Sequence, residues 1–105
     1  MGRITKLEAI KLLADVPEEH KFWCADGNVF KNLSELDKAL NRMDENAFKH
    51  HVNKEKNDFS NWIRDIIQDE TLAGKVIKAR NKKSTINMVK KRVSILKNLT
   101  KNKKS

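Results

Sequence analysis

Apolar residues spaced three and four positions apart recur along most of this chain, and they predict helices. The first helix is predicted at 6–15, because Thr5 and Glu8 form a capping-box pattern at its start. Further residues that typically cap helices precede the other apolar stripes: Asn32, Asp44, Asn57 or Asp58, and Asp69, with a last helix beginning near Ser84. The pattern predicts a mainly α-helical, small domain of five to six helices.

Residues 20–31 lack this helical spacing and predict a β-hairpin. The expected strand residues are Phe22, Trp23, Val29 and Phe30, around the turn signal Asp26-Gly27. Because an isolated two-stranded hairpin is marginally stable in water, some of these side chains must pack against the helices. Trp23 is expected to pack in this way, with stacking on a nucleic-acid base between Lys21 and Lys31 as the alternative.

The most regular apolar stripe follows Asn57 and comprises Phe59, Trp62, Ile63, Ile66 and Ile67. This spacing is typical of a helix buried along one face, and we expect it to form the centre of the core. Phe59 and Trp62 are therefore expected to pack inside the protein. The acidic residues near this helix, Asp58, Asp65 and Asp69, are expected to cap helices or carry surface charge.

The last predicted helix is amphipathic. Its apolar side comprises Ile86, Val89, Val93 and Leu96, widened by Met88, Ile95 and Leu99 and interrupted by Arg92. Its opposite side is basic or small and polar, with Lys83, Asn87, Lys90, Lys91, Ser94, Lys97 and Lys101. We expect a 1–80 helical domain with the β-hairpin, followed by an 81–105 basic amphipathic helix with a short disordered tail. The apolar side is expected to dock on the domain, and a homodimer through its remaining exposed part is an alternative.

Charge is distributed very unevenly along the 105 residues. The net charge is +9, yet residues 1–70 hold 11 basic and 14 acidic side chains, whereas residues 71–105 hold 12 basic and no acidic ones. Such asymmetry is typical of a protein that binds a polyanion through one segment. The candidate nucleic-acid-binding residues are Lys75, Lys78, Arg80, Lys82, Lys83, Lys90, Lys91, Arg92, Lys97, Lys101, Lys103 and Lys104.

Lysine supplies ten of these twelve charges. Because lysine contacts phosphate as a point charge, whereas arginine favours bidentate base contacts, we expect low-specificity binding to duplex DNA, as in a nucleoid or chromatin protein. RNA or ribosome binding is the close alternative, since phosphate contacts do not distinguish the two polymers. Two other classes are a protein-interaction module, in which the apolar arc with Arg92 docks a partner helix, and a membrane-surface helix, which the lack of Trp or Phe after Trp62 disfavours.

The sequence offers little for catalysis or for cofactor binding. Cys24, His20, His50 and His51 are the only soft metal ligands and lack a recognisable ligand spacing, and a Cys24–His51 nucleophilic pair lacks a motif for an oxyanion hole. We therefore expect no enzyme activity, no catalytic residues, no metal or other cofactor, and no small-molecule substrate. Without a membrane span, a signal segment or a second cysteine, the chain is expected to be soluble and cytoplasmic, at the nucleoid.

The run from Phe22 to Ala73 resembles a family of small, uncharacterised, mainly archaeal proteins. The resemblance covers about half of the chain, and its most specific part is the block HVNKEKNDFSNWIRDI at residues 51–66, with the pattern HVNxxKNDFxNWIxD. Other matching positions are Asp26-Gly27, Leu33-Ser34-Glu35-Leu36, Ala39-Leu40, Met43 and Phe48. The resemblance implies a shared fold and lineage, and it implies no particular activity.

Overall fold

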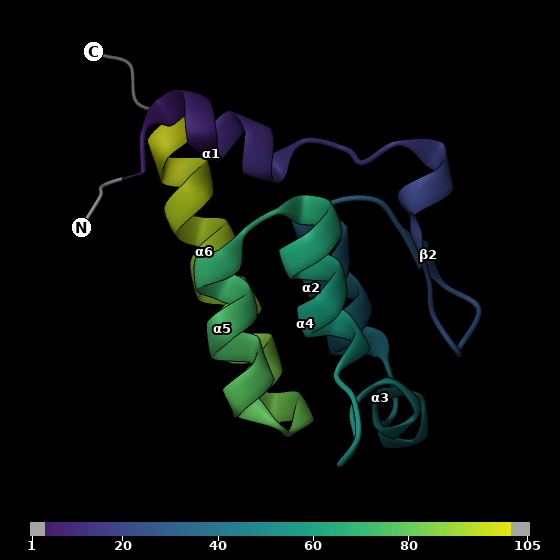
Figure 1. Ribbon diagram of the computed structural model, residues 1–105. Helices are drawn as coiled ribbons and strands as arrows, with labels where there is room; N and C mark the ends of the chain where they lie inside the picture. The colour runs from purple at the N-terminus through teal and green to yellow at the C-terminus, as the bar shows by residue number, and fades with distance from the viewer. Residues whose placement is uncertain (1–3, 102–105) are drawn as a thin grey trace.

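A computed structural model describes residues 4–101 and shows a mainly helical domain with one antiparallel hairpin, as predicted (Figure 1). The α-helices are α1 (Lys6–Leu13), α2 (Leu33–Arg42), α3 (Glu45–His51), α4 (Asp58–Trp62), α5 (Glu70–Ala79) and α6 (Lys82–Lys101). The strands are β1 (Phe22–Trp23) and β2 (Val29–Phe30). The 3₁₀ turn η1 (Glu18–His20) precedes β1, and the π-helical segment η2 (Ile63–Ile67) continues α4.

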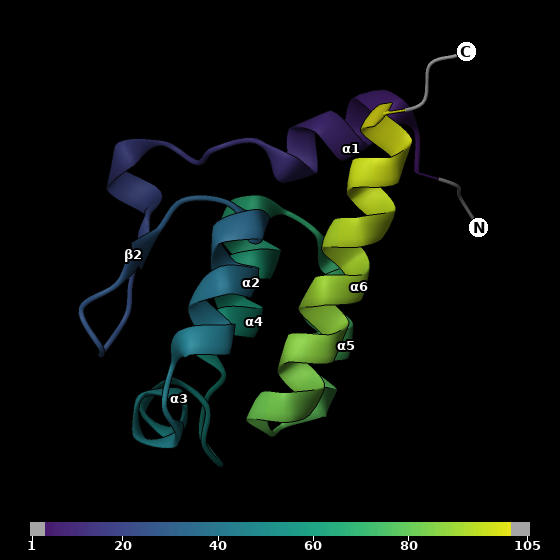
Figure 2. The same cartoon turned by 180° about the vertical axis from the view of Figure 1, so that it is seen from behind.

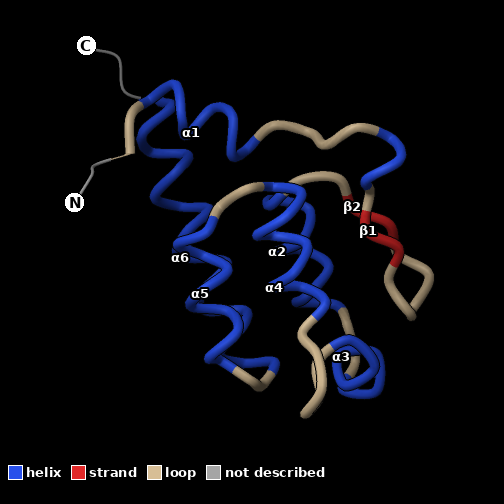
Figure 3. The backbone as a smooth tube through the Cα atoms, in the orientation of Figure 1, coloured by secondary structure: helices blue, strands red, loops and turns tan. Residues whose placement is uncertain are grey.

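The long helices form two layers. In Figure 1, α4 and α5 lie in front of α2 and α6, and the view from behind in Figure 2 shows α2 and α6 facing the reader. Helix α6 contacts α1, α2 and α5, whereas α4 contacts α5. The hairpin projects at one edge of this body, at the far side from α6 (Figure 3). The basic helix α6 is therefore packed against three other helices as part of the helical body.

The predicted capping residues all perform that role. Thr5 and Glu8 form a complete capping box, and Asn32, Asp44, Asn57 and Asp69 each accept a hydrogen bond from the backbone N–H three residues later. Two predicted boundaries were wrong by two residues. Helix α1 ends at Leu13, and α6 starts at Lys82 because Asn81 caps it by accepting from the backbone N–H of Ser84 at 2.8 Å.

The hairpin has one buried and one exposed face. Phe22 pairs with Phe30 and Trp23 pairs with Val29, while Gly27 supplies the turn with a φ of 93°. Phe22 and Phe30 are buried, but Trp23 is 72% exposed, so the predicted packing of Trp23 in the core is wrong. Side chains alternate between the two faces of a strand, and the face that meets the helices is the one that carries the two phenylalanines.

The core is centred on α4 and η2, as predicted. Phe59 and Ile63 are fully buried, and Phe59 stacks with Phe22 at a centroid distance of 5.2 Å. The Trp62 side chain is buried too, and its Nε1–H donates to the carbonyl of His20 at 2.8 Å. These contacts join the hairpin to the central helix.

Helix α6 belongs to the same core. Thr85, Val89, Val93 and Leu96 are buried along one side of the helix, and Ile86, Met88 and Leu99 pack partly against them. The predicted docking of this apolar side is thus what the structure shows. Residues on both sides of position 80 therefore contribute to one core.

Candidate nucleic-acid interface

The exposed cations of α6 lie on the side of the helix that faces away from the core. Lys83, Lys91 and Lys101 are exposed and form no ion pair among residues 4–101. Lys90 and Lys97 are also exposed but lie beside α2. The Nζ of Lys90 is 4.0 Å from the Asp37 carboxylate, and that of Lys97 is 3.3 Å from the Ser34 hydroxyl.

Arg92 is not part of this exposed surface, which corrects its prediction as a nucleic-acid contact. Its guanidinium donates to both carboxylate oxygens of Asp69, with Nε–Oδ2 at 2.7 Å and Nη2–Oδ1 at 2.9 Å. The side chains of Arg92 and Asp69 are only 13% and 1% exposed. Arg92 interrupts the apolar arc of α6 because its side chain neutralises a buried carboxylate. It is therefore as unavailable to a partner helix as it is to a nucleic acid.

Lys82 is likewise directed into the protein. Its Nζ donates to the carbonyl of Met43, the residue that follows α2, and its side chain is half-buried. In the sequence Lys82 resembles a free cation because its partner lies 39 positions away in the chain. Lys82 is therefore not one of the exposed cations without a partner in the protein.

The remaining predicted residues divide between α5 and the end of the chain. Lys75 and Lys78 on α5, and Arg80 just after it, are exposed and form no ion pair among the described residues. These cations are therefore on or next to α5, which lies in the other layer from α6 (Figures 1 and 2). Lys103 and Lys104 lie outside the described residues.

A pocket that the sequence did not predict lies where the loop between α3 and α4 approaches the end of α5. Its volume is about 310 Å³, near the lower end of the range typical of small-molecule sites, roughly 300–1,000 Å³. It is lined by Val52, Asn53, Lys54, Glu55, Lys56, Asn57, Ile77 and Arg80. Lys54 and Lys56 belong to the mixed-charge first part of the chain, so only the fold brings them near Arg80.

A larger hollow of about 990 Å³ lies between α1, η2 and the start of α5. Its charged lining residues include Glu8, Lys11, Arg64, Asp65 and Glu70. Arg64 and Asp65 pair with each other at 2.9 Å. The mixture of both charge signs favours no particular ligand class.

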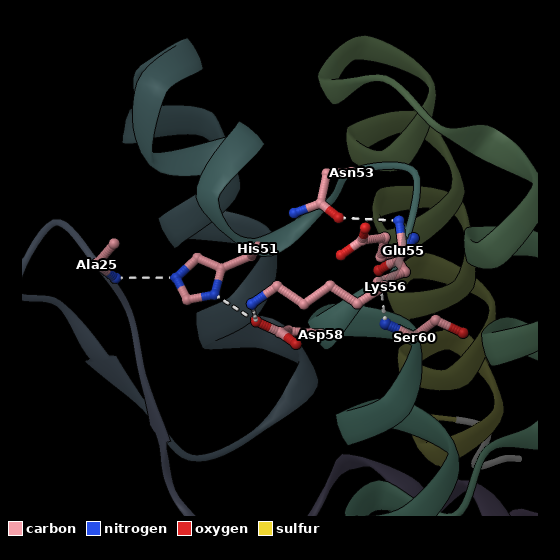
Figure 4. Close-up of polar contacts among 8 residues, drawn as sticks. Ala25, His51, Asn53, Glu55, Lys56, Asp58 and Ser60 are labelled. Atoms are coloured by element: carbon pink, nitrogen blue, oxygen red, sulfur yellow. Dashed lines mark hydrogen bonds and ion pairs between the residues drawn. The ribbon is translucent and has the colours of Figure 1, made fainter.

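His51 links the hairpin to α4 through both nitrogens of its ring (Figure 4). Its Nε2 accepts from the backbone N–H of Ala25 at 2.9 Å, so the proton of the neutral ring is on Nδ1, which donates to Asp58 Oδ2 at 2.9 Å. Lys56 Nζ donates to the same carboxylate oxygen at 2.9 Å. The network joins the end of α3, the loop that follows it and the start of α4 to the hairpin.

This network also bears on the thiol chemistry considered for Cys24. Both ring nitrogens of His51 already have partners, and burial raises the pKa of the Cys24 thiol. A raised pKa reduces the thiolate fraction that a nucleophile requires. Among the described residues, no three His, Cys, Asp or Glu side chains are grouped so that they could hold a metal ion.

Trp23 is exposed, as the predicted alternative of stacking on a nucleic-acid base requires. The two lysines beside it, however, are paired with carboxylates. Lys21 Nζ lies 2.9 Å from the Glu18 carboxylate, and Lys31 Nζ lies 3.7 Å from that of Asp15. The aromatic face is therefore available, whereas the charges beside it are partly neutralised.

We expect the Asp58 carboxylate to make stability depend on pH in the acid range. Although partial burial opposes it, hydrogen bonds from His51 and Lys56 hold the pKa of Asp58 below its ordinary value. A depressed folded-state pKa stabilises the protein above the unfolded pKa of about 4, and this contribution is lost as the pH falls through the folded pKa. Asp58→Asn should therefore lose less stability than the wild type between about pH 5 and pH 2, measured by urea unfolding. An unchanged pH dependence would contradict this assignment.

In the described part of the chain, every helix is too short or too polar to cross a lipid bilayer. Comparison with protein-family models, curated proteins and solved structures found no match to this chain. The resemblance of residues 22–73 to an archaeal family therefore stays a prediction.

Proposed function

We propose that this protein is a non-enzymatic, low-specificity nucleic-acid-binding protein that contacts backbone phosphates, with duplex DNA at the nucleoid as its ligand. The observation that carries the proposal is the segregation of charge: twelve cations and no carboxylate in residues 71–105. Seven of these cations are exposed and form no ion pair among residues 4–101: Lys75, Lys78, Arg80, Lys83, Lys91, Lys97 and Lys101.

The type of cation supports low specificity. With Arg92 paired to Asp69, Arg80 is the one exposed arginine in residues 71–101, and the other free cations of this segment are lysines. Lysine contacts phosphate without reading the base sequence. The same engagement of Arg92 weakens the alternative of a protein-interaction module, because that alternative depended on Arg92 as a contact.

The proposal is tested by changing exposed charges while leaving the core intact. The test variant combines Lys83→Gln, Lys91→Gln and Lys101→Gln, three exposed residues of α6. The slope of log affinity against log salt on duplex DNA is negative, and its magnitude should decrease by about 0.9 for each phosphate that the variant no longer neutralises. Affinity at low salt should decrease on the order of tenfold or more. Fluorescence anisotropy over a salt series measures both quantities.

A matched control removes three exposed lysines from elsewhere on the protein, Lys6, Lys38 and Lys49, by the same substitution. Both variants have the same net charge, so a difference between them reports the location of the charge. If both variants weaken DNA binding equally, the effect is one of general charge, which would contradict a specific role for the exposed lysines of α6. Tighter binding of duplex RNA than of duplex DNA would favour the RNA alternative, and no binding at ~50 mM salt would refute nucleic-acid binding.

A further inference from the structure

The pocket beside Arg80 combines a concave shape with an excess of positive charge. Its lining contains three cations, Lys54, Lys56 and Arg80, and one carboxylate, that of Glu55. Lys56 donates to Asp58 at 2.9 Å and extends toward His51 (Figure 4). Lys54 and Arg80 are exposed and form no ion pair among the described residues. Two cations are therefore free to meet an anion here, against one acidic group.

The pocket is held in place by buried contacts. Asn57 accepts from the backbone N–H of Ser60 at 3.0 Å, and its amide nitrogen donates to the carbonyl of Val76 at 3.4 Å. The loop is closed at its base by a backbone bridge between Val52 and Asn57. These contacts tie the loop to α5 and so fix the distance between the loop and the residues at the end of that helix.

The backbone at Arg80 adds a second, independent observation. Arg80 has a φ of 61°, the left-handed conformation in which glycine is the favoured residue after a helix. A side chain at this position costs stability relative to glycine. The arginine at this position puts a guanidinium, the side chain best suited to bidentate contact with phosphate, at the rim of the pocket.

We propose that this pocket binds a phosphate group, with Arg80 as the principal contact and Lys54 as the second cation. The inference deepens the proposed function and rests on it for one point, that the phosphate belongs to a nucleic acid. Glu55 opposes anion binding through its charge. Removing that charge should therefore strengthen the binding.

The test uses the full chain, isotope-labelled for NMR and titrated with inorganic phosphate. Saturable shifts are expected for the amides of 53–57 and 77–80. Arg80→Gly should weaken phosphate binding by roughly tenfold or more, because a charge-assisted hydrogen-bonding group is lost. It should leave the melting temperature unchanged or higher, because the backbone conformation suits glycine.

Gln68→Gly is the matched control. Gln68 is the other non-glycine residue with positive φ in residues 4–101, at 70°, and it lies outside this pocket. We expect it to change the backbone in the same way and to leave phosphate affinity unaltered. Glu55→Gln should increase the affinity for phosphate. Shifts that do not saturate, or that Arg80→Gly leaves unchanged, would overturn the inference.

A short duplex oligonucleotide with or without a terminal phosphate then distinguishes the source of the anion. If the oligonucleotide displaces inorganic phosphate from the pocket, as seen in the amide signals of residues 53–57, the result would support both the pocket and the proposed function. Phosphate binding with no oligonucleotide binding would support the pocket and refute the proposed function. Oligonucleotide binding that neither shifts residues 53–57 nor responds to Arg80→Gly would refute the pocket alone.

Discussion

Replacing Arg92 with methionine is expected to lower the free energy of unfolding by about 3–5 kcal/mol, the cost of removing one partner of a buried ion pair. The carboxylate of Asp69 is 1% exposed and would lose both of its hydrogen bonds to the guanidinium. Asp69 also accepts from the backbone N–H of Leu72 and so caps α5. This remaining hydrogen bond cannot compensate the buried negative charge of Asp69. Most of the cost of leaving that charge unpaired should therefore appear in the free energy of unfolding measured with urea.

Lys91→Met provides the control for this substitution. Lys91 is adjacent in sequence but exposed, so its replacement should change the free energy of unfolding by no more than about 0.5 kcal/mol. Combining Arg92→Met with Asp69→Asn removes the charge and keeps an N-cap, so it should recover part of the lost stability. A loss below about 1 kcal/mol for Arg92→Met would show that the pair is not needed by the fold.

A chain that ends at residue 80 is expected not to fold. Helix α6 contributes the buried side chains of Val89, Val93 and Leu96 and contacts three other helices, α1, α2 and α5. Each fully buried side chain of this size contributes about 1.5–3 kcal/mol, and together they approach the total stability of a small domain, about 5–15 kcal/mol. Circular dichroism of the truncated chain should show little helix and no cooperative thermal transition.

This dependence on α6 affects how nucleic-acid binding can be measured. Loss of binding by a chain that lacks α6 would report unfolding as well as loss of charge, whereas the lysine-to-glutamine variants keep the core. A truncated chain with near-wild-type helix content and a cooperative transition would show instead that residues 1–80 form a domain of their own.

Much of the secondary structure could be predicted because its causes are local. The caps at Asn32, Asp44 and Asp69 depend on a side chain and a backbone N–H three residues away, and the structure confirms each of them. The hairpin turn at Asp26-Gly27 depends on the left-handed conformation that glycine allows. The apolar stripe of α4 and η2 identified the core for the same reason, since its period is visible within ten residues.

The roles of individual surface and site residues were harder to predict. Trp23 and Phe22 are adjacent, and the pattern did not show which of them faces the helices. Arg92 and Lys82 resemble free cations in the sequence, whereas the first neutralises Asp69 and the second donates to Met43. The pocket near Arg80 joins the 53–57 loop to the end of α5, two segments that α4 and η2 separate in the sequence.

The sequence by itself therefore determined the helices, their caps, the hairpin, the core stripe and the excess of positive charge after residue 70. Only the tertiary structure decided which cations are exposed, which hairpin face is buried and where a pocket forms. The physical reason is one of range. Capping and periodic burial act between residues a few positions apart, whereas the partner of a long charged side chain is set by which helix packs opposite it, and that follows from the burial of the whole apolar surface.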